Sequence, residues 1–559
     1  MKRHLTVKIL ALLMALLFSV VLDPAGIRVR AEETKADETE AVTDGTEDPT
    51  HIAEFIGFEA ITVDFPEEPL LEYPVADGGS FSLFIPLAGV ASKYYTSLSE
   101  SPTVIEWIED TGITVEFVHP PAGQTTENFT LLATTGDLPD AIVNGNSYYP
   151  GGDVAAVNDG VFMDLTDLVE DYMPDYYYFM ENNDLFRKMA TTADGMVYSI
   201  YNYKDVQAPY YMRPQFRSDW LEEADLEVPR TYDDWEDYFD WVLENQEDVA
   251  PFMLHPSGIE NLFLGSFEAG GGGVGRFFQT NGVIRYMFNE PGFEDYLSMM
   301  NDWWNKGYIH PDFATTDLSR EEALTNGVAA AACSNTDGVF TLAKELDVET
   351  GTAPYPRVDE DDEYHMDIFY FPQNGTPTSF KADSDNIEAA MKFINYGYTR
   401  HGSGVANFGV FDETWTMSDE GIPEFTEEVL TQTEIPMSDV EYVFRLHTMW
   451  SKYRYGDDIS MIRNVAETET WDYRARWGDD PTSDNAYAIP TLSFTPEAAE
   501  EIGELTADIN TYAEEMVLRF ITGDAPMSDY DGFVDRLNEL GMQRLIELYQ
   551  EAFDAFLVK

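Results

Sequence analysis

The clearest hydrophobic pattern lies early in the chain and predicts a strand, a helix and a second strand. Ile113, Val115 and Phe117 alternate with polar residues, which is the two-residue period of a half-buried strand. The next segment carries an apolar stripe at helical spacing and ends at Gly136, a residue type common at helix ends. Residues 141–143 then begin a buried strand. A strand, a crossover helix and a strand form a βαβ unit, which requires a parallel sheet.

The same patterns continue as alternating strands and helices and end in a helical region. Thr231 precedes one predicted helix and is a residue type that caps helix starts. From Thr495 onward nearly every segment has helical spacing. The predicted elements include a strand at 81–87, helices at 103–110, 232–244, 293–307 and 386–398, and a buried strand at 327–333. This alternation predicts the α/β class.

The N-terminus has the pattern of a signal peptide. Basic residues precede the apolar run 9–21, which is shorter than an ordinary membrane span. Val29 and Ala31 form a cleavage motif, so the mature chain is expected to start at Glu32. The alternative is an uncleaved segment that anchors the protein to the membrane.

Charge and cysteine content narrow the function classes. The chain of 559 residues is long enough for two or more lobes. It has 104 acidic and 32 basic residues and a net charge of −72, which argues against binding nucleic acid or an anionic membrane through its general surface. Cys333 is the only cysteine and lies in an apolar run. We therefore expect a buried thiol and no internal disulfide.

Several segments, in a fixed order, carry a family resemblance. They are the βαβ unit with its ending GDLPDAIV, the run FRSDWL at 216–221 with PRT at 229–231, and FITG at 520–523 with LYQEA at 548–552. Together they resemble the extracellular solute-binding protein family 1 of carbohydrate ABC transporters, in its large, lipoprotein-like branch. The resemblance covers residues 81–559. That branch usually carries a cysteine after its signal peptide, and this chain departs from the pattern, so it is not expected to be a typical lipoprotein.

The resemblance implies a periplasmic-binding-protein-like (type II) fold of two α/β lobes with a ligand cleft between them. Hinge closure would trap the ligand, and no chemistry on the ligand is implied. The expected parts are a signal peptide (1–31), an acidic tether and lead-in (32–80), the first part of lobe 1 (81–205), lobe 2 (206–368), and a return crossing with a helical C-terminal part that completes both lobes (369–559).

Candidate ligand-binding residues are polar and aromatic side chains at strand ends and in loops. Ligands of open α/β sheets bind outside the carboxyl ends of the strands, and sugars pack their C–H faces on aromatic rings. The residues expected to bind are Asn144, Asn146, Tyr148, Tyr149, Arg217, Trp220, Ser334, Asn335, Trp415, Trp471, Arg474 and Trp477. Trp415 is the preferred platform, and the two arginines suit a carboxylate. The alternatives are a surface turn for 144–149 and core packing for each tryptophan.

The sequence lacks motifs for catalysis, metals and cofactors. It has no G-x-S-x-G, H-E-x-x-H or Walker-type motif, and its histidines are dispersed without ligand spacing. The stretches 244–254 and 359–363 lack the oxygen spacing and turn glycine of a calcium loop. The glycines of 270–275 follow no clear strand. We therefore expect no metal site and no cofactor.

These observations predict an exported, monomeric solute-binding protein that captures an oligosaccharide for the permease subunits of an ABC importer. No nucleic-acid partner is expected. Two alternatives remain open: a binder of peptides or another nutrient on the same scaffold, and a secreted carbohydrate-active enzyme with an unrecognised active site.

Overall fold

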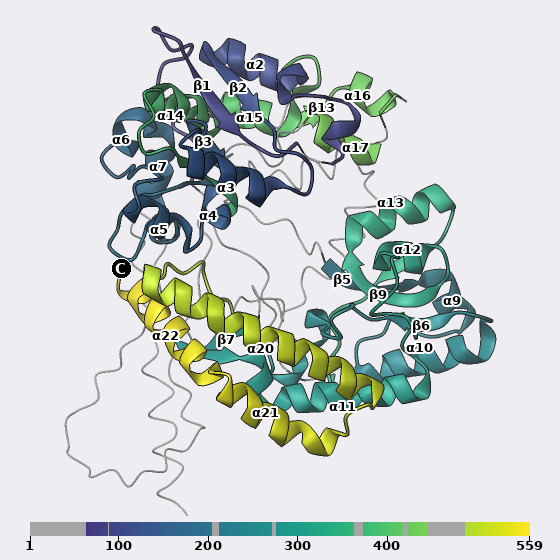
Figure 1. Ribbon diagram of the computed structural model, residues 1–559. Helices are drawn as coiled ribbons and strands as arrows, with labels where there is room; N and C mark the ends of the chain where they lie inside the picture. The colour runs from purple at the N-terminus through teal and green to yellow at the C-terminus, as the bar shows by residue number, and fades with distance from the viewer. Residues whose placement is uncertain are drawn as a thin grey trace, which may run out of the picture.

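The computed structural model describes residues 63–87, 89–203, 212–270, 276–360, 362, 373–417, 423–432, 434–435, 437–444 and 487–559. These residues form two lobes, each with its own sheet and hydrophobic core, and long C-terminal helices run along both (Figure 1). Within these ranges, no helix is both long enough and apolar enough to cross a membrane. The predicted α/β class and two-lobe organisation are confirmed.

Lobe 1 is built on a five-stranded sheet with the order β2-β1-β3-β11-β4. Its strands are β1 (Gly79–Phe84), β2 (Ile113–Val118), β3 (Ala141–Val143), β4 (Ile200–Tyr203) and β11 (Gln373–Phe380). β1 pairs in parallel with β2 and β3, whereas β11 runs antiparallel to β3 and β4. The predicted βαβ unit is therefore confirmed, with β1 lying between its two strands.

Helices cover both faces of the lobe 1 sheet. They are α2 (Pro102–Thr111), α3 (Thr125–Thr135), α4 (Gly145–Tyr148), α5 (Gly152–Asn158), α6 (Val169–Tyr172), α7 (Pro174–Asn182), α8 (Asp184–Ala190), α14 (Ile387–Asn395) and α15 (Arg400–Phe408). α2 and α3 stop at Gly112 and Gly136, whose φ angles of 71° and 78° lie in the left-handed region that favours glycine. Trp107 of α2 is fully buried in the lobe 1 core.

Lobe 2 is built on a four-stranded sheet with the order β10-β5-β9-β6. Its strands are β5 (Met212–Arg217), β6 (Ala250–Met253), β9 (Ala329–Asn335) and β10 (Thr350–Thr352), and its helices are α9 (Ser218–Glu223), α10 (Tyr232–Asn245), α11 (Pro291–Lys306), α12 (Arg320–Thr325) and α13 (Thr336–Leu346). Thr231 caps α10, and its side chain and that of Asp234 form a capping box. This confirms the predicted N-cap.

Smaller elements flank the lobes. β7 (Phe277–Thr280) and β8 (Val283–Tyr286) form one hairpin, and β12 (Trp415–Met417) pairs with β13 (Pro423–Phe425). The short helices α16 (Glu427–Thr431) and α17 (Met437–Phe444) follow. The last helices are α20 (Pro496–Thr522), α21 (Tyr530–Glu539) and α22 (Met542–Val558). α20 packs on α11, its residues Val517 and Phe520 belong to the lobe 2 core, and it also contacts α5 of lobe 1.

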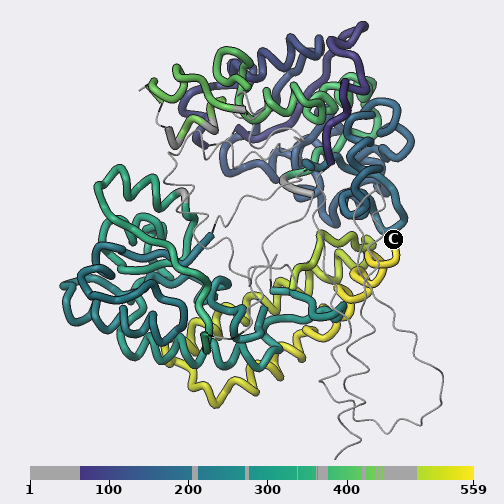
Figure 2. The backbone as a smooth tube through the Cα atoms, turned by 180° about the vertical axis from the view of Figure 1, so that it is seen from behind, coloured from purple at the N-terminus to yellow at the C-terminus, as the bar shows by residue number. Residues whose placement is uncertain are grey.

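α8 is shared by the two lobes. Its residues Leu185 and Met189 belong to the core of lobe 2, while Phe186 belongs to the core of lobe 1. The Lys559 ammonium donates a hydrogen bond of 2.8 Å to the carbonyl of Lys188, so the end of α22 holds the end of α8. Figure 2 shows this C-terminal end beside the blue helices of lobe 1. α8 and the last helix therefore form part of the junction between the lobes, together with the contact of α20 with α5.

Candidate functional site

The carboxyl ends of β1 and β3 meet at one edge of the lobe 1 sheet. β3 is followed directly by Asn144, with a φ of 62°, and by the helical turn α4, where we expected an irregular loop. The Ser147 hydroxyl donates to Asn144 Oδ1 over 2.8 Å, and the Asn144 N–H donates to the Pro377 carbonyl over 2.6 Å. Asn144 and Asn146 are half-buried. They lie at the kind of edge where α/β sheets bind ligands.

Tyr148 and Tyr149 are shared between this edge and a small hydrophobic core. Tyr148 packs edge-on against Phe84 with ring centroids 6.2 Å apart, and Tyr149 packs against Phe162 at 6.1 Å. The Tyr149 hydroxyl donates to Asp159 Oδ2 over 2.7 Å. Both tyrosines are half-buried. Part of each tyrosine therefore supports the fold, and the rest is exposed.

The corresponding edge of lobe 2 joins the carboxyl ends of β6 and β9 to the amino end of β5. Ser334 pairs with Arg213 in the antiparallel register of β9 and β5. Gln215 Nε2 donates to the Ser334 carbonyl over 2.9 Å and to its hydroxyl over 3.0 Å, and Ser334 is fully buried. Asn335 Oδ1 accepts from the Gly338 N–H over 3.2 Å. The structure brings Ser334 and Asn335 to one edge, but as the last residues of a strand and not in the expected loop.

Further polar residues lie near these edges that our sequence analysis did not select. Arg213 and Gln215 share one face of β5 because they are two residues apart, and the Arg213 guanidinium lies 4.5 Å from the ring centre of Tyr355. The available signal was the run Arg-Pro-Gln where the chain enters lobe 2. In α5 of lobe 1, burial raises the pKa of Asp153, and hydrogen bonds oppose that shift.

Arg217 and Trp220 lie at the opposite end of lobe 2. Arg217 is the last residue of β5, so roughly 17 Å of strand separates it from the amino end. Its guanidinium donates two hydrogen bonds to the Asp219 carboxylate, at 2.9 and 2.6 Å, and lies 4.2 Å from the Trp220 ring centre. Figure 1 shows α9, which carries Trp220, on the side of lobe 2 away from lobe 1. The structure therefore does not bring these residues together with Ser334 and Asn335.

Trp415 begins β12 and is only 2% exposed, which differs from the expected open platform. Its Nε1–H donates to the Gly409 carbonyl over 2.9 Å, and its ring packs against Phe408 and Phe411 at 5.8 and 4.9 Å. A Cβ on Gly404 would lie 2.3 Å from the indole, so a glycine of α15 makes room for the ring. The ring is therefore largely covered by the protein, although it also lines the cavity described below. The remaining predicted residues fall outside the described ranges: Trp471, Arg474 and Trp477.

Comparison with known proteins bears on this two-lobe arrangement. A family model described as bacterial extracellular solute-binding protein matches residues 106–401. The chain belongs to this family. It is 22% identical over 475 residues to the polygalacturonan/rhamnogalacturonan-binding protein YtcQ of Bacillus subtilis (strain 168), covering 80% of this chain and 87% of that protein. It is 20% identical over 485 residues to the fructooligosaccharide ABC transporter substrate-binding protein FusA of Streptococcus pneumoniae serotype 4, covering 80% and 86%.

A solved structure supports the fold of this solute-binding protein. The alginate-binding protein AlgQ2, in a crystal structure without calcium ion, superimposes with a TM-score of 0.70 at 18% identity, over 86% of this chain and 99% of that one. This confirms the periplasmic-binding-protein-like fold that the resemblance implied.

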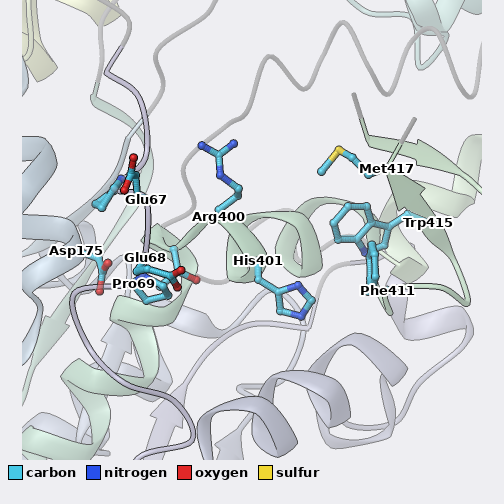
Figure 3. A pocket seen from close by; sticks show the side chains of 11 residues that line it. Glu67, Glu68, Pro69, Asp175, Arg400, His401, Phe411, Trp415 and Met417 are labelled. Atoms are coloured by element: carbon cyan, nitrogen blue, oxygen red, sulfur yellow. The ribbon is translucent and has the colours of Figure 1, made fainter. Parts of the chain in front are cut away.

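The solute-binding protein also has a cavity of about 270 Å³ in lobe 1, between the segment that precedes β1 and helix α15. Figure 3 shows Arg400 and His401 between the acidic side chains and the aromatic ones. The cavity is lined by Pro66, Glu67, Glu68, Pro69, Asp175, Thr399, Arg400, His401, Phe411, Trp415 and Met417. The Asp175 carboxylate accepts from the Leu70 N–H over 2.9 Å, so its role is to hold the lead-in segment on lobe 1.

A buried ion pair supports the sheet of lobe 2. Arg320 Nη1 lies 3.0 Å from Glu260 Oε2, and the two side chains are 18% and 4% exposed. Arg320 begins α12, which packs against β9. Burial raises the pKa of Glu260 to about 7, although the charge of Arg320 and its hydrogen bond act in the opposite direction. Burial therefore disfavours the charged form of Glu260 more strongly than Arg320 favours it.

This shift predicts that stability falls as pH rises toward neutrality. The pKa of Glu260 is about 7 in the folded protein, against an ordinary value of 4.5, so the folded state holds a proton that the unfolded chain has released. The resulting stabilisation is complete at pH values below the pKa of Glu260 in the unfolded chain. It is lost as the pH rises through the pKa of Glu260 in the folded protein, by at most ~1.4 kcal/mol per pH unit. Urea unfolding between pH 5 and 8 measures the slope. Glu260→Gln is expected to remove this component, and an identical slope in the variant would contradict the assignment.

Proposed function

We propose that this protein is exported and captures an oligosaccharide between its two lobes for delivery to the permease subunits of an ABC importer. The observation that carries the proposal is the alignment with YtcQ and FusA along 80% of the chain. The names of both relatives specify carbohydrate ligands, and FusA is named as an ABC transporter component. AlgQ2, named for alginate, shares the fold.

The chemistry of the two sheet edges supports a sugar ligand. Asn144 and Asn146 in lobe 1 and Asn335 in lobe 2 supply amides, and the parts of Tyr148 and Tyr149 that remain open supply rings. Amide groups pair with sugar hydroxyls, and aromatic rings pack on the C–H faces of a sugar ring. In this proposal closure of the lobes about the α8 junction brings both sets of groups onto one ligand.

The proposal includes the location and the mode of action. Residues 1–31 act as a cleaved signal peptide, and the protein works as a monomer outside the cell without a lipid-anchor cysteine after that segment. Its net charge of −72 suits a well-solvated exported protein. It leaves its ligand chemically unchanged, as expected for a member of a binding-protein family.

Isothermal titration with matched ligand panels tests this function. We expect saturable binding of oligogalacturonides or fructo-oligosaccharides at one site per chain, no binding of peptides of similar length, and recovery of intact sugar. Binding of peptides alone would contradict the carbohydrate ligand. Release of shorter products from a bound sugar would contradict the absence of catalysis.

Three alanine variants test the position of the site. Asn146→Ala is expected to weaken binding by about tenfold, because it removes a hydrogen-bonding group at the lobe 1 edge, a loss on the order of 1 to 1.5 kcal/mol. Asn305→Ala, an exposed amide of α11, is the matched control. Arg217→Ala is expected to leave affinity unchanged because its guanidinium pairs with Asp219 at the far end of β5. If Arg217→Ala weakens binding and Asn146→Ala does not, the ligand lies at the other end of lobe 2.

A further inference from the structure

Three metal-ligating side chains from two helices of lobe 1 converge beside the cavity. Glu106 and Asp110 are one turn apart on α2, and His401 is the second residue of α15. One ligand atom from each residue lies within 4.8 Å of the other two. His401 Nε2 is 3.5 Å from Asp110 Oδ2. We propose that these residues bind a divalent transition-metal ion of the zinc type, which ties α2 to α15.

The ligand set and its spacing point to this class of ion. Zinc is held by imidazole nitrogen and carboxylate oxygen at bond lengths that set two tetrahedral ligands about 3.3 Å apart. The separation of 3.5 Å between His401 and Asp110 is close to this value. Calcium and magnesium prefer oxygen ligands alone. The imidazole, which comes from a different helix than the two carboxylates, is therefore the group that selects a transition metal.

The charge around Glu106 favours a cation. Its surroundings include the carboxylates of Asp110, Glu109 and Glu413. Among the described residues, neither Glu106 nor Asp110 forms an ion pair with a lysine or an arginine, and His401 is the basic partner of Asp110. A divalent ion would supply the positive charge that this part of α2 lacks.

Neighbouring groups already orient two of the three ligands. The Tyr396 hydroxyl donates a hydrogen bond to Asp110 Oδ2. The His401 ring is held edge-on between Tyr396 at 6.4 Å and Phe411 at 5.8 Å. Such outer contacts commonly fix the ligands of metal sites. His401 is 48% exposed and lines the cavity, which gives an ion a path of entry (Figure 3).

The site is separate from the proposed ligand edge. Asp110 lies in the last turn of α2, which leads through Gly112 into the amino end of β2. The carboxyl ends of β1 and β3, where we place the sugar, are at the other end of the same sheet. The metal would therefore act on lobe 1 itself, by joining a helix near the start of the lobe to one that follows the return crossing.

Titration of the full chain with zinc after dialysis against a chelator tests the site, with 10 mM magnesium present to occupy diffuse acidic sites. We expect one zinc ion per chain and a higher thermal midpoint with zinc. Glu106→Gln and His401→Gln are each expected to weaken zinc binding at least tenfold, and Tyr396→Phe about tenfold. Glu127→Gln is the matched control, because it removes the same charge from an exposed position of α3.

Two results would overturn the proposal. One is zinc affinity in His401→Gln equal to that of the parent chain. The other is an equal loss in Glu127→Gln and Glu106→Gln, which would mean diffuse attraction to an acidic surface. Thermal unfolding without zinc shows that each variant folds, and His401→Gln is the safest of them since its side chain is 48% exposed.

Discussion

Arg320→Met is expected to destabilise lobe 2 by about 1 to 3 kcal/mol at pH 8. The change keeps most of the side-chain volume but removes the partner of Glu260, whose side chain is 4% exposed. An unpaired carboxylate in that environment must either stay charged without a partner or take up a proton. Because the protonated form avoids the penalty, the destabilisation should be clearly smaller at pH 5 than at pH 8. Urea unfolding followed by tryptophan fluorescence and far-UV circular dichroism measures both.

The matched control is Arg544→Met. Arg544 hydrogen bonds to Glu501 in a pair of similar geometry, at 2.9 and 3.0 Å, but both side chains are more than 40% exposed. Water and salt screen such a pair, so no measurable change is expected. The double variant Glu260→Gln/Arg320→Met should recover much of the lost stability, since it leaves no charge buried. If Arg320→Met and Arg544→Met have equal effects, the Glu260 pair is not the support of lobe 2 that we describe.

Gly292→Ala is expected to destabilise the protein by about 3 kcal/mol or more. Gly292 is the second residue of α11, and a Cβ at this position would lie 1.5 Å from the Phe267 carbonyl oxygen. That oxygen belongs to the backbone, so the overlap cannot be relieved by rotating a side chain. The start of α11 would have to move, although its residues Phe293 and Tyr296 are fully buried in the lobe 2 core. Chemical unfolding of the variant measures the loss.

Gly503→Ala is the control with the opposite expected sign. Gly503 lies within α20 and is exposed, and no atom lies within 4 Å of the Cβ that alanine would add. Alanine is favoured over glycine inside a helix by roughly 0.5 to 1 kcal/mol. Stability should therefore rise in this variant and fall in Gly292→Ala. A similar response at both positions would show that helix propensity, and not the contact with Phe267, governs Gly292.

Local patterns predicted most of the elements. The alternation at 113–117 became β2, and Gly136, with its φ of 78°, ended α3 as expected. Thr231 caps α10 as its residue type suggested. The strand predicted at 327–333 lies two residues later in the structure, since β9 spans Ala329–Asn335. Its last residues pair with the start of β5, and no pattern within a single segment contains that pairing.

The candidate site was less predictable than the fold. The rule that ligands lie at carboxyl ends of strands selected Asn144 and Asn335, which the structure places at such ends. Trp415 was chosen because it is aromatic and lies outside the predicted helices, but its ring packs against Phe408 and Gly404 of α15, and its Nε1–H donates to the Gly409 carbonyl. Arg217 was chosen for its charge, but it is the last residue of β5 and lies at the end of the strand opposite Arg213. The type of a residue and its neighbours in the chain do not reveal which other residues contact its side chain in the folded protein.

The sequence by itself determined the α/β class, the positions of most helices and strands, the strongly acidic surface and the family resemblance. These properties depend on residue spacing, charge and turn chemistry, which act over a few neighbours in the chain. Only the tertiary structure decided which residues share a site. Glu260 meets Arg320 and Asp110 meets His401 across long stretches of chain, because sheet order and helix packing bring distant segments together. Burial then sets the pKa of Glu260 and the cover over Trp415, and burial is a property of the packed lobe as a whole.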